Sequence, residues 1–401
     1  MAPVHPSDPS SADTMRWSMV AVALLLNILN GYGLTIMAVV GPAMIAAGVG
    51  TAADIAAASA WGLTGMAAGS LLLAQVADGA GRRPVAIIAA LAIALGLLLP
   101  MVGCTVTFPV SALILSRLLA GLGIGILLPL TDVIAAEAAP DGRRPLAVAI
   151  MLTGYGIGAL SAMLGGPALG AVHWGAGLAA GAGAALIAAL LAAQVLASPA
   201  PHPRHRVPLV TVLTSRAILS VAGMALIYAL HVATLGYVLG TLPRLMVQAG
   251  ASAAMAQGAA LAGNLAGIAG GLTLGWLAMR MPVRHLLIAV MLGGGAAAAL
   301  FGLSAAHPPL LAGLLILSFA LVQSAMVGLY VMMATLFPAS IRVTGVGLVL
   351  GCGRMGSVIA AALAGRLAAA HMDGGAIVAI VALGTIAGAL LVRLLPLRAA
   401  A

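Results

Sequence analysis

The sequence predicts an all-α membrane protein with twelve transmembrane helices in two pseudo-symmetric six-helix halves. Of the 401 residues, 63% are hydrophobic and only 6% are charged. A soluble chain of this length cannot keep its surface hydrated with so few charges, so most of the surface must face lipid. The 52 glycines indicate closely packed helices, because small residues let helix backbones approach one another inside a membrane.

Apolar segments divide the chain into a short tail and two halves. A transmembrane helix needs about 20 apolar residues. The segments long enough are 17–42, 54–76, 84–104, 108–134, 145–170, 174–197, 216–240, 252–278, 285–305, 309–335, 343–369 and 374–396. Residues 1–16 are polar and lack the pattern of a signal peptide, so we expect a cytoplasmic tail. The longest polar connector, 198–215, is a predicted cytoplasmic linker between an N-terminal half (17–197) and a C-terminal half (216–401).

The arginines set the predicted orientation. All 17 cations are Arg, and an inside N-terminus places thirteen of them on the cytoplasmic side. The outer connectors then carry only Arg244 and Arg366. This asymmetry predicts a multi-pass protein with both termini in the cytoplasm. A composition rich in Ala, Gly and Arg without Lys suggests a bacterial cytoplasmic membrane. The net charge of +9 is explained by these anchors without a nucleic-acid partner.

The composition excludes several kinds of chemistry. A chain without Lys has neither a P-loop nor a Schiff-base amine. Cys104 and Cys352 are far apart, and the eight His are scattered, with no His-Glu-x-x-His pattern. We therefore expect no enzyme activity, no cofactor and no metal site. A receptor that binds a ligand without transporting it is an alternative that measurable flux would exclude.

The two halves also resemble each other internally. Pro140 with Arg144 in the first half parallels Pro338 with Arg342 in the second. Parallel repeats of this kind place a substrate site between the halves, near the middle of the membrane.

Four blocks of sequence resemble motifs of the major facilitator superfamily. Residues 74–83 (AQVADGAGRR) resemble its loop signature Gly-x-x-x-Asp-x-x-Gly-Arg-Lys/Arg, with Ala in the first position. Residues 116–125 (SRLLAGLGIG), followed by 137–140 (EAAP), and the weaker 242–245 (LPRL) extend the likeness. The most specific block is 337–347 (FPASIRVTGVG), continuing to 353–356 (GRMG). Together they resemble the aromatic acid:proton symporter branch, which implies a secondary transporter for a small organic anion.

One motif departs from that branch. Its first helix usually carries Asp-Gly-Tyr/Phe-Asp, whereas residues 30–33 read NGYG, so both acids are missing. A proton-coupled carrier needs a titratable group at the moving site. His231, in the middle of the seventh segment, is our candidate for proton coupling because His titrates near neutral pH. A His that only hydrogen-bonds two helices together is an equally good interpretation.

Two arginines and five uncharged polar residues are the candidates for substrate binding. Arg117 and Arg354 lie nearest the bilayer centre, where an unpaired charge is costly, and each offers a planar fork of donors to a carboxylate. Pairing with helix carbonyls or with acids at helix ends is the alternative. The polar candidates near the middle of the membrane are Asn27, Asn30, Tyr155, Asn264 and Gln323. Each also suits a hydrogen bond between helices.

The resemblance implies a gate at the first cytoplasmic connector. Asp78 matches the superfamily acid that approaches the start of the eleventh helix, where a helix N-terminus favours a carboxylate. Arg82 and Arg83 then pair with Asp132 or Glu137 beneath the first repeat. This latch would hold the outward-facing state, and simple interfacial anchoring is the alternative.

The expected function is secondary active transport of a small organic anion, an aromatic carboxylate, by alternating access in a monomer surrounded by lipid. The branch implies proton symport, but the missing acids leave uniport and exchange open. A drug or metabolite efflux carrier of the same superfamily is the alternative, because residues 166–170 (GPALG) partly resemble an antiporter signature.

Overall fold

The twelve predicted membrane segments are all helices in the structure. The computed structural model describes residues 14–102, 110–196, 217–304, 308–338 and 341–395. Twelve described helices are long and apolar enough to cross a membrane, which confirms the predicted fold class. They are α1 (Trp17–Ala46), α2 (Ala52–Ala68) with the π-helical turn η2 (Gly69–Leu73), α4 (Arg82–Val102), α5 (Val110–Glu137), α6 (Arg144–Val172), α7 (Ala176–Val195), α9 (Ala217–Gln248), α10 (Ala253–Leu277), α11 (Val283–Leu303), α12 (Pro308–Leu336), α13 (Arg342–Ala369) and α14 (Gly374–Leu394).

Two short helices lie in connectors between membrane helices. The short helices are α3 (Val76–Ala80) and the 3-10 turn η3 (Asp141–Arg143). The predicted linker 198–215 and residues 1–13 of the predicted tail lie outside the described residues.

The seventh helix is longer than predicted. Its predicted end was residue 240, but α9 continues through Pro243 to Gln248. A proline inside a helix removes one backbone hydrogen bond, which is why the sequence suggests an end there. Leu242 and Met246 on either side are fully buried, and this packing offsets the lost bond.

The two halves share one internal packing plan. In the first half, α1 packs on α6, α5 packs on α2 and α4, and α4 packs on α7. In the second half, α9 packs on α13, α12 packs on α10 and α11, and α11 packs on α14. These pairs correspond one to one along the chain, so the described helices form two pseudo-symmetric six-helix bundles.

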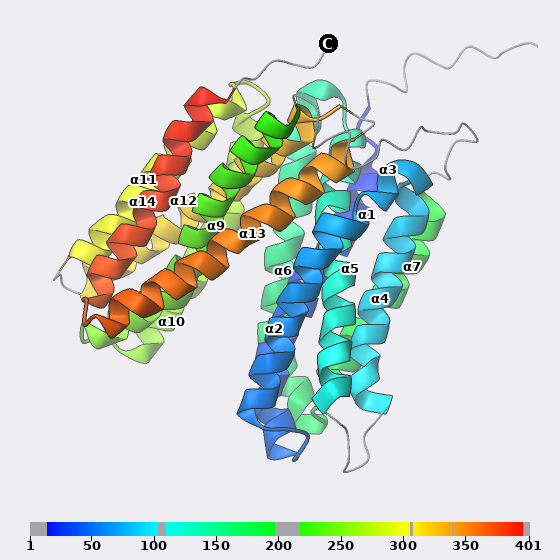
Figure 1. Ribbon diagram of the computed structural model, residues 1–401, viewed down its shortest axis with the longest axis horizontal. Coiled ribbons are helices and arrows are strands. Elements are labelled where there is room, and N and C mark those ends of the chain that lie inside the picture. Colours follow the sequence, from blue (N-terminus) through cyan, green and yellow to red (C-terminus); the bar gives the residue numbers. More distant parts are fainter. Residues whose placement is uncertain (1–13, 103–109, 197–216, 305–307, 339–340, 396–401) are drawn as a thin grey trace, which may run out of the picture.

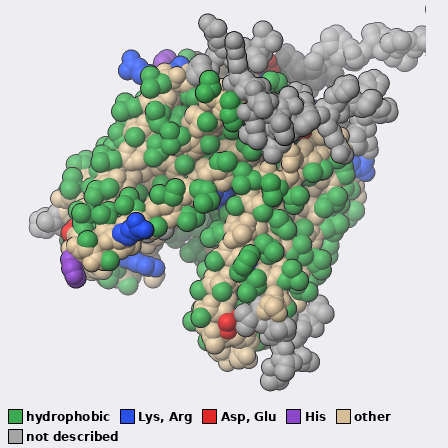
Figure 2. Space-filling view, viewed as in Figure 1, with side chains coloured by type: hydrophobic (Ala, Val, Ile, Leu, Met, Phe, Trp, Pro, Cys, Tyr) green, Lys and Arg blue, Asp and Glu red, His purple; other side chains and the backbone are tan. Residues whose placement is uncertain are grey.

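The bundles meet at one end and separate at the other. They converge around α3 and the start of α13, and they diverge toward the α1–α2 and α13–α14 connectors (Figure 1). We call the end with α3, η3 and the start of α13 the closed face. Figure 2 shows a cleft that opens between the bundles at the opposite end, and hydrophobic side chains over much of the visible outer surface. An apolar outer surface is what lipid requires.

Glycines set the closest helix approach in the first half. A Cβ atom on Gly158 of α6 would lie 1.9 Å from the carbonyl oxygen of Ile28 on α1. A Cβ atom on Gly31 of α1 would lie 2.0 Å from the carbonyl oxygen of Tyr155 on α6. Both obstacles are backbone atoms, which cannot rotate away. Gly31, the first glycine of the NGYG motif, is therefore explained by the crossing of α1 and α6.

Replacing Gly158 by Ala is expected to destabilise the first half by about 1–3 kcal/mol, because the extra methyl group forces α1 and α6 apart. Thermal unfolding of the purified protein in detergent measures the change. The matched control is Gly165→Ala on the same helix, where an added Cβ meets nothing within 4 Å. There the substitution should leave stability unchanged or raise it slightly, since Ala favours a helix over Gly. Equal effects of the two substitutions would contradict this account of the crossing.

Candidate substrate cavity and gate

A cavity of about 280 Å³ lies between the two halves. Its walls come from α1, α5 and α6 on one side and from α9, α10, α12 and α13 on the other. Most of the lining is apolar, with a few polar groups from both halves, as is typical of small-molecule sites. Among the described residues that line it, Arg354 is the only charged one.

Arg354 is the centre of a polar cluster in this cavity. It is half-buried on α13, and its Nε atom has no hydrogen-bond partner among the described residues. Tyr155, Tyr228 and Tyr330 line the same cavity, within electrostatic range of this guanidinium. The rings of Tyr228 and Tyr330 meet edge to face, with centroids 6.4 Å apart. A guanidinium with a free donor beside tyrosine hydroxyls is suited to bind a carboxylate.

Three of the predicted polar residues line the same cavity. Asn27 lines it while its Nδ2 atom donates to the carbonyl oxygen of Met151 at 3.0 Å. Gln323 lines it from the other half and donates to Oδ1 of Asn264 at 3.1 Å. Tyr155 is the third and belongs to the Arg354 cluster. These groups have the position that a substrate site requires.

The other predicted substrate residues are not part of the lining. Arg117 is buried in the first half and donates to the carbonyl oxygen of Gly96 at 3.1 Å. Asn30 is buried and donates to Oδ1 of Asn27 at 3.2 Å, and Asn264 donates to a carbonyl of its own helix. Arg117 thus joins α5 to α4, and Asn264 joins α10 to α12 through Gln323, as their alternatives predicted, whereas the bond of Asn30 stays within α1.

His231 also makes the contacts of its alternative interpretation. It is fully buried on α9, away from the cavity lining. Its Nδ1 atom lies 2.7 Å from Oγ1 of Thr385 on α14, and its Nε2 atom lies 3.0 Å from the carbonyl oxygen of Val322 on α12. Both ring nitrogens are thus engaged in joining three helices.

Sequence reasoning did not select Tyr228 and Tyr330 for the site. Both are buried, and both lie within helices whose sequences are almost entirely apolar. Tyrosine is rare in this chain, with five in 401 residues, and a buried Tyr hydroxyl usually has a polar partner. The scarcity of tyrosine was therefore the feature of the sequence that could have pointed to Tyr228 and Tyr330 as site residues.

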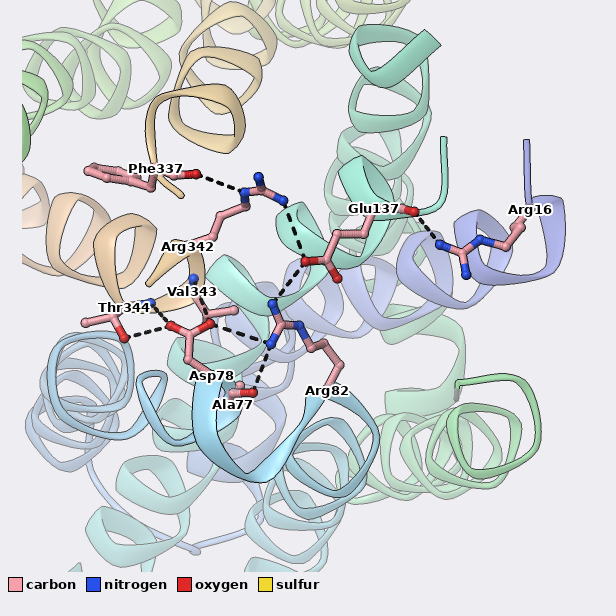
Figure 3. Close-up of polar contacts among 9 residues, drawn as sticks. All are labelled: Arg16, Ala77, Asp78, Arg82, Glu137, Phe337, Arg342, Val343 and Thr344. Atoms are coloured by element: carbon pink, nitrogen blue, oxygen red, sulfur yellow. Dashed lines mark hydrogen bonds and ion pairs between the residues drawn. The ribbon is translucent and has the colours of Figure 1, made fainter. Parts of the chain in front are cut away.

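The closed face is held by a carboxylate at a helix N-terminus. Asp78 of α3 accepts hydrogen bonds from the first turn of α13 in the other half (Figure 3). The N–H of Val343 donates to Oδ1 at 3.3 Å, and the N–H and hydroxyl of Thr344 each donate to Oδ2 at 2.8 Å. The carboxylate satisfies N–H donors that a helix N-terminus leaves unpaired, and the positive end of the helix dipole attracts its negative charge.

Glu137 extends this contact into an ion-pair network (Figure 3). Its Oε1 atom lies 3.0 Å from Nη2 of Arg82 and 3.6 Å from Nη1 of Arg342. Arg82 comes from the same half as Glu137, whereas Arg342 begins α13 in the other half. Arg82 also lies 3.6 Å from Asp78 and thereby joins the two contacts. The main chain of Glu137 accepts from the Arg16 side chain.

Asp132, the alternative to Glu137 in our prediction, makes no hydrogen bond in this network. It is fully buried, and neither carboxylate oxygen has a hydrogen-bond partner among the described residues. The side chain of Arg82 is occupied by Glu137, Asp78 and the carbonyl oxygen of Ala77. Of the two acids that we predicted as partners of Arg82, the structure pairs it with Glu137 and not with Asp132. Arg83 is half-buried near the start of α4.

Burial raises the pKa of the Asp78 carboxyl, even though Thr344, Arg82 and Val343 act in the opposite direction. When the closed face opens, water reaches Asp78 and its pKa returns toward the ordinary value. Asp78 therefore binds a proton more readily in the closed arrangement, and proton uptake favours closure. That contribution is lost as the pH rises through the raised pKa. In either protonation state an oxygen remains to accept from α13.

Comparison with known proteins agrees with this architecture. The family model described as Major Facilitator Superfamily matches residues 23–229. A gallate transporter of Pseudomonas putida is 26% identical, over 88% of this chain and 85% of its own length. A 4-hydroxybenzoate transporter of Acinetobacter baylyi is 24% identical, over 86% of this chain and 83% of its own. The crystal structure of the Escherichia coli fucose:proton symporter superposes with a TM-score of 0.75 at 15% identity, covering 94% of this chain and 98% of that one.

Proposed function

The chain belongs to the major facilitator superfamily of membrane transporters. From this premise we propose that it carries a small aromatic carboxylate together with a proton across a bacterial cytoplasmic membrane. The observation that carries the proposal is the Arg354 cluster. A single positive charge among the described lining residues, which are otherwise uncharged, favours an anion over a cation or a neutral molecule. The unpaired donor leaves a binding position for one carboxylate oxygen.

The rest of the lining suits an aromatic ring. The edge-to-face pair of Tyr228 and Tyr330 lies beside apolar side chains such as Val232 and Met326. Aromatic rings favour such edge and face contacts, and Met is adaptable against a flat ring. The names of two relatives, a gallate and a 4-hydroxybenzoate transporter, support the same class of substrate.

Alternating access is the transport mode that this proposal entails. The N-terminal half (17–197) and the C-terminal half (216–401) would rock about the cavity, so that the cleft opens on one side of the membrane at a time. The Arg distribution supports a cytoplasmic position for the closed face, with the tail 1–16, the linker 198–215 and both termini on that side. One chain supplies both walls of the cavity, which supports a monomer in the lipid bilayer.

The proposal is tested with the purified full-length protein in liposomes. Uptake of radiolabelled benzoate, 4-hydroxybenzoate and gallate is measured with and without an inward proton gradient, and benzyl alcohol serves as a neutral competitor. We expect uptake of at least one acid, stimulated by the gradient and inhibited by the other acids but not by the alcohol. Uptake that ignores the gradient would leave the substrate class intact and refute symport. No flux of any of the acids would refute the substrate class and favour the efflux carrier.

A further inference from the structure

One buried acid is not used by the substrate cavity or by the closed-face contacts. Asp132 lies in the last two turns of α5, before Glu137, and none of its side chain is exposed. Both of its oxygens are buried without a hydrogen-bond donor among the described residues. An ionised carboxylate in such a position is strongly unfavourable, whereas the neutral acid avoids most of the penalty. The arrangement therefore indicates a group that holds a proton in this conformation.

Two groups from the other half lie within electrostatic range of this carboxyl. They are Arg342 at the start of α13 and Tyr330 on α12. The helices α1, α2, α4 and α6 also pack on α5. Of their described charged groups, Arg82 of α4 and Arg144 of α6 act on Arg342 instead. Among the described residues, the charged group that acts on Asp132 is thus Arg342, which belongs to the other half.

Its two neighbours connect the substrate site with the gate. Tyr330 lines the cavity and belongs to the Arg354 cluster. Arg342 pairs with Glu137 and donates from Nε to the carbonyl oxygen of Phe337 at 3.2 Å, so it is held by the closed-face contacts. A charge that appears on Asp132 would compete with Glu137 for Arg342. The protonation state of this one carboxyl can therefore affect both the cavity, through Tyr330, and the closed-face contacts, through Arg342.

We infer that Asp132 is the proton-binding site of this carrier and supplies the titratable group that the first helix lacks. The inference rests on the proposed transport function and assigns its coupling ion to a residue. With the cleft open, a proton reaches the carboxylate from cavity water past the Tyr330 hydroxyl, and an O–H bond forms. When the closed face opens, water reaches the carboxyl and the same bond breaks. The proton is released on the other side, and Arg342 is drawn from Glu137 toward the new charge.

The first test separates coupling from transport in liposomes. Asp132→Asn fixes a neutral side chain, so we expect gradient-driven accumulation of the aromatic acid to be lost. Exchange of labelled for unlabelled acid involves no net proton movement and is expected to continue. Asp132→Glu keeps a titratable carboxyl and should restore gradient stimulation. The matched control is Asp141→Asn, an 86% exposed acid at the same face, which should remain coupled. Accumulation by Asp132→Asn at the wild-type level would overturn the inference.

A second test needs no substrate and therefore stands even if the aromatic-acid assignment fails. Spin labels are placed at Gly142→Cys and Met281→Cys, both exposed, in a background with Cys104 and Cys352 replaced by Ser. These positions lie on opposite halves of the closed face, because the end of α10 contacts the start of α6 through Gly275. Electron-spin distance measurements then follow the opening of this face as a function of pH.

The wild type is expected to shift toward longer distances as the pH rises, because ionised Asp132 disfavours closure. Asp132→Asn should open less than the wild type at alkaline pH, keeping only the part of the response that Asp78 contributes, and Asp141→Asn should behave as the wild type does. If Asp132→Asn opens with pH as the wild type does, another group such as Asp78 carries the response and the inference fails. If no aromatic acid is transported but Asp132→Asn still loses part of the pH response of the wild type, the substrate assignment is refuted and the proton-site assignment is retained.

Discussion

Substitution of Arg354 by Ala is expected to abolish uptake of aromatic acids. The guanidinium is the charged group of the cavity, and its Nε atom is unpaired. Losing a charge-assisted hydrogen-bonded pair costs about 3 kcal/mol, which weakens binding by about 100-fold. Equilibrium binding of labelled 4-hydroxybenzoate to the purified protein, followed by uptake in liposomes, measures both consequences.

Two further variants make this result specific. Arg354→Lys keeps the charge but loses the planar fork, so its affinity should fall between those of the wild type and Arg354→Ala. Arg366→Ala removes an exposed Arg from the same helix and should leave binding unchanged. Wild-type affinity in Arg354→Ala, or an equal loss in Arg366→Ala, would show that the anion binds elsewhere.

Substitution of Asp78 by Ala is expected to open the closed face. The N–H groups of Val343 and Thr344 would lose their acceptor at a half-buried contact between the halves. An unsatisfied buried donor costs about 1–3 kcal/mol. A change of about 1.4 kcal/mol shifts the ratio of closed to open molecules tenfold. The labels at positions 142 and 281 should report a predominantly long distance.

The matched control for this prediction is another capping acid. Asp373 accepts from the N–H groups of Gly375 and Ala376 at the start of α14, in a contact confined to one half. Asp373→Ala removes a similar cap without touching the boundary between the halves, so the label distance should stay short. An equally short distance in Asp78→Ala would mean that Glu137 with Arg342 suffices to hold the face closed.

The contact that holds the closed face was predictable from the sequence in outline. The acid of residues 74–83 lies in a short connector between two apolar segments, so its position at a membrane face follows from topology. Its partner at the start of α13 came from the family resemblance, and the structure places Asp78 against Val343 and Thr344. The choice between Glu137 and Asp132 as the partner of Arg82 could not be made, because both lie near the same helix end and only the rotation of α5 separates them.

The candidate substrate cavity was predictable only in part. Arg117 and Arg354 are equivalent by sequence, since each is a single Arg within a long apolar helix. The structure turns Arg354 into the cavity and Arg117 toward the carbonyl oxygen of Gly96. Apolar residues surround both arginines along their helices, so no amphipathic pattern distinguishes the cavity side from the packed side. Tyr330 was missed for the same reason.

The sequence by itself determined the number, order and approximate ends of the membrane helices. A long apolar run in lipid must satisfy its backbone hydrogen bonds internally, so a helix is the available solution whatever its neighbours are. Only the tertiary structure decided which polar side chains face the cavity, which join helices and which remain buried alone, as Asp132 does. Those outcomes depend on how each helix is rotated and tilted against the others, and in a membrane this is set by close packing of small residues across helices distant in sequence.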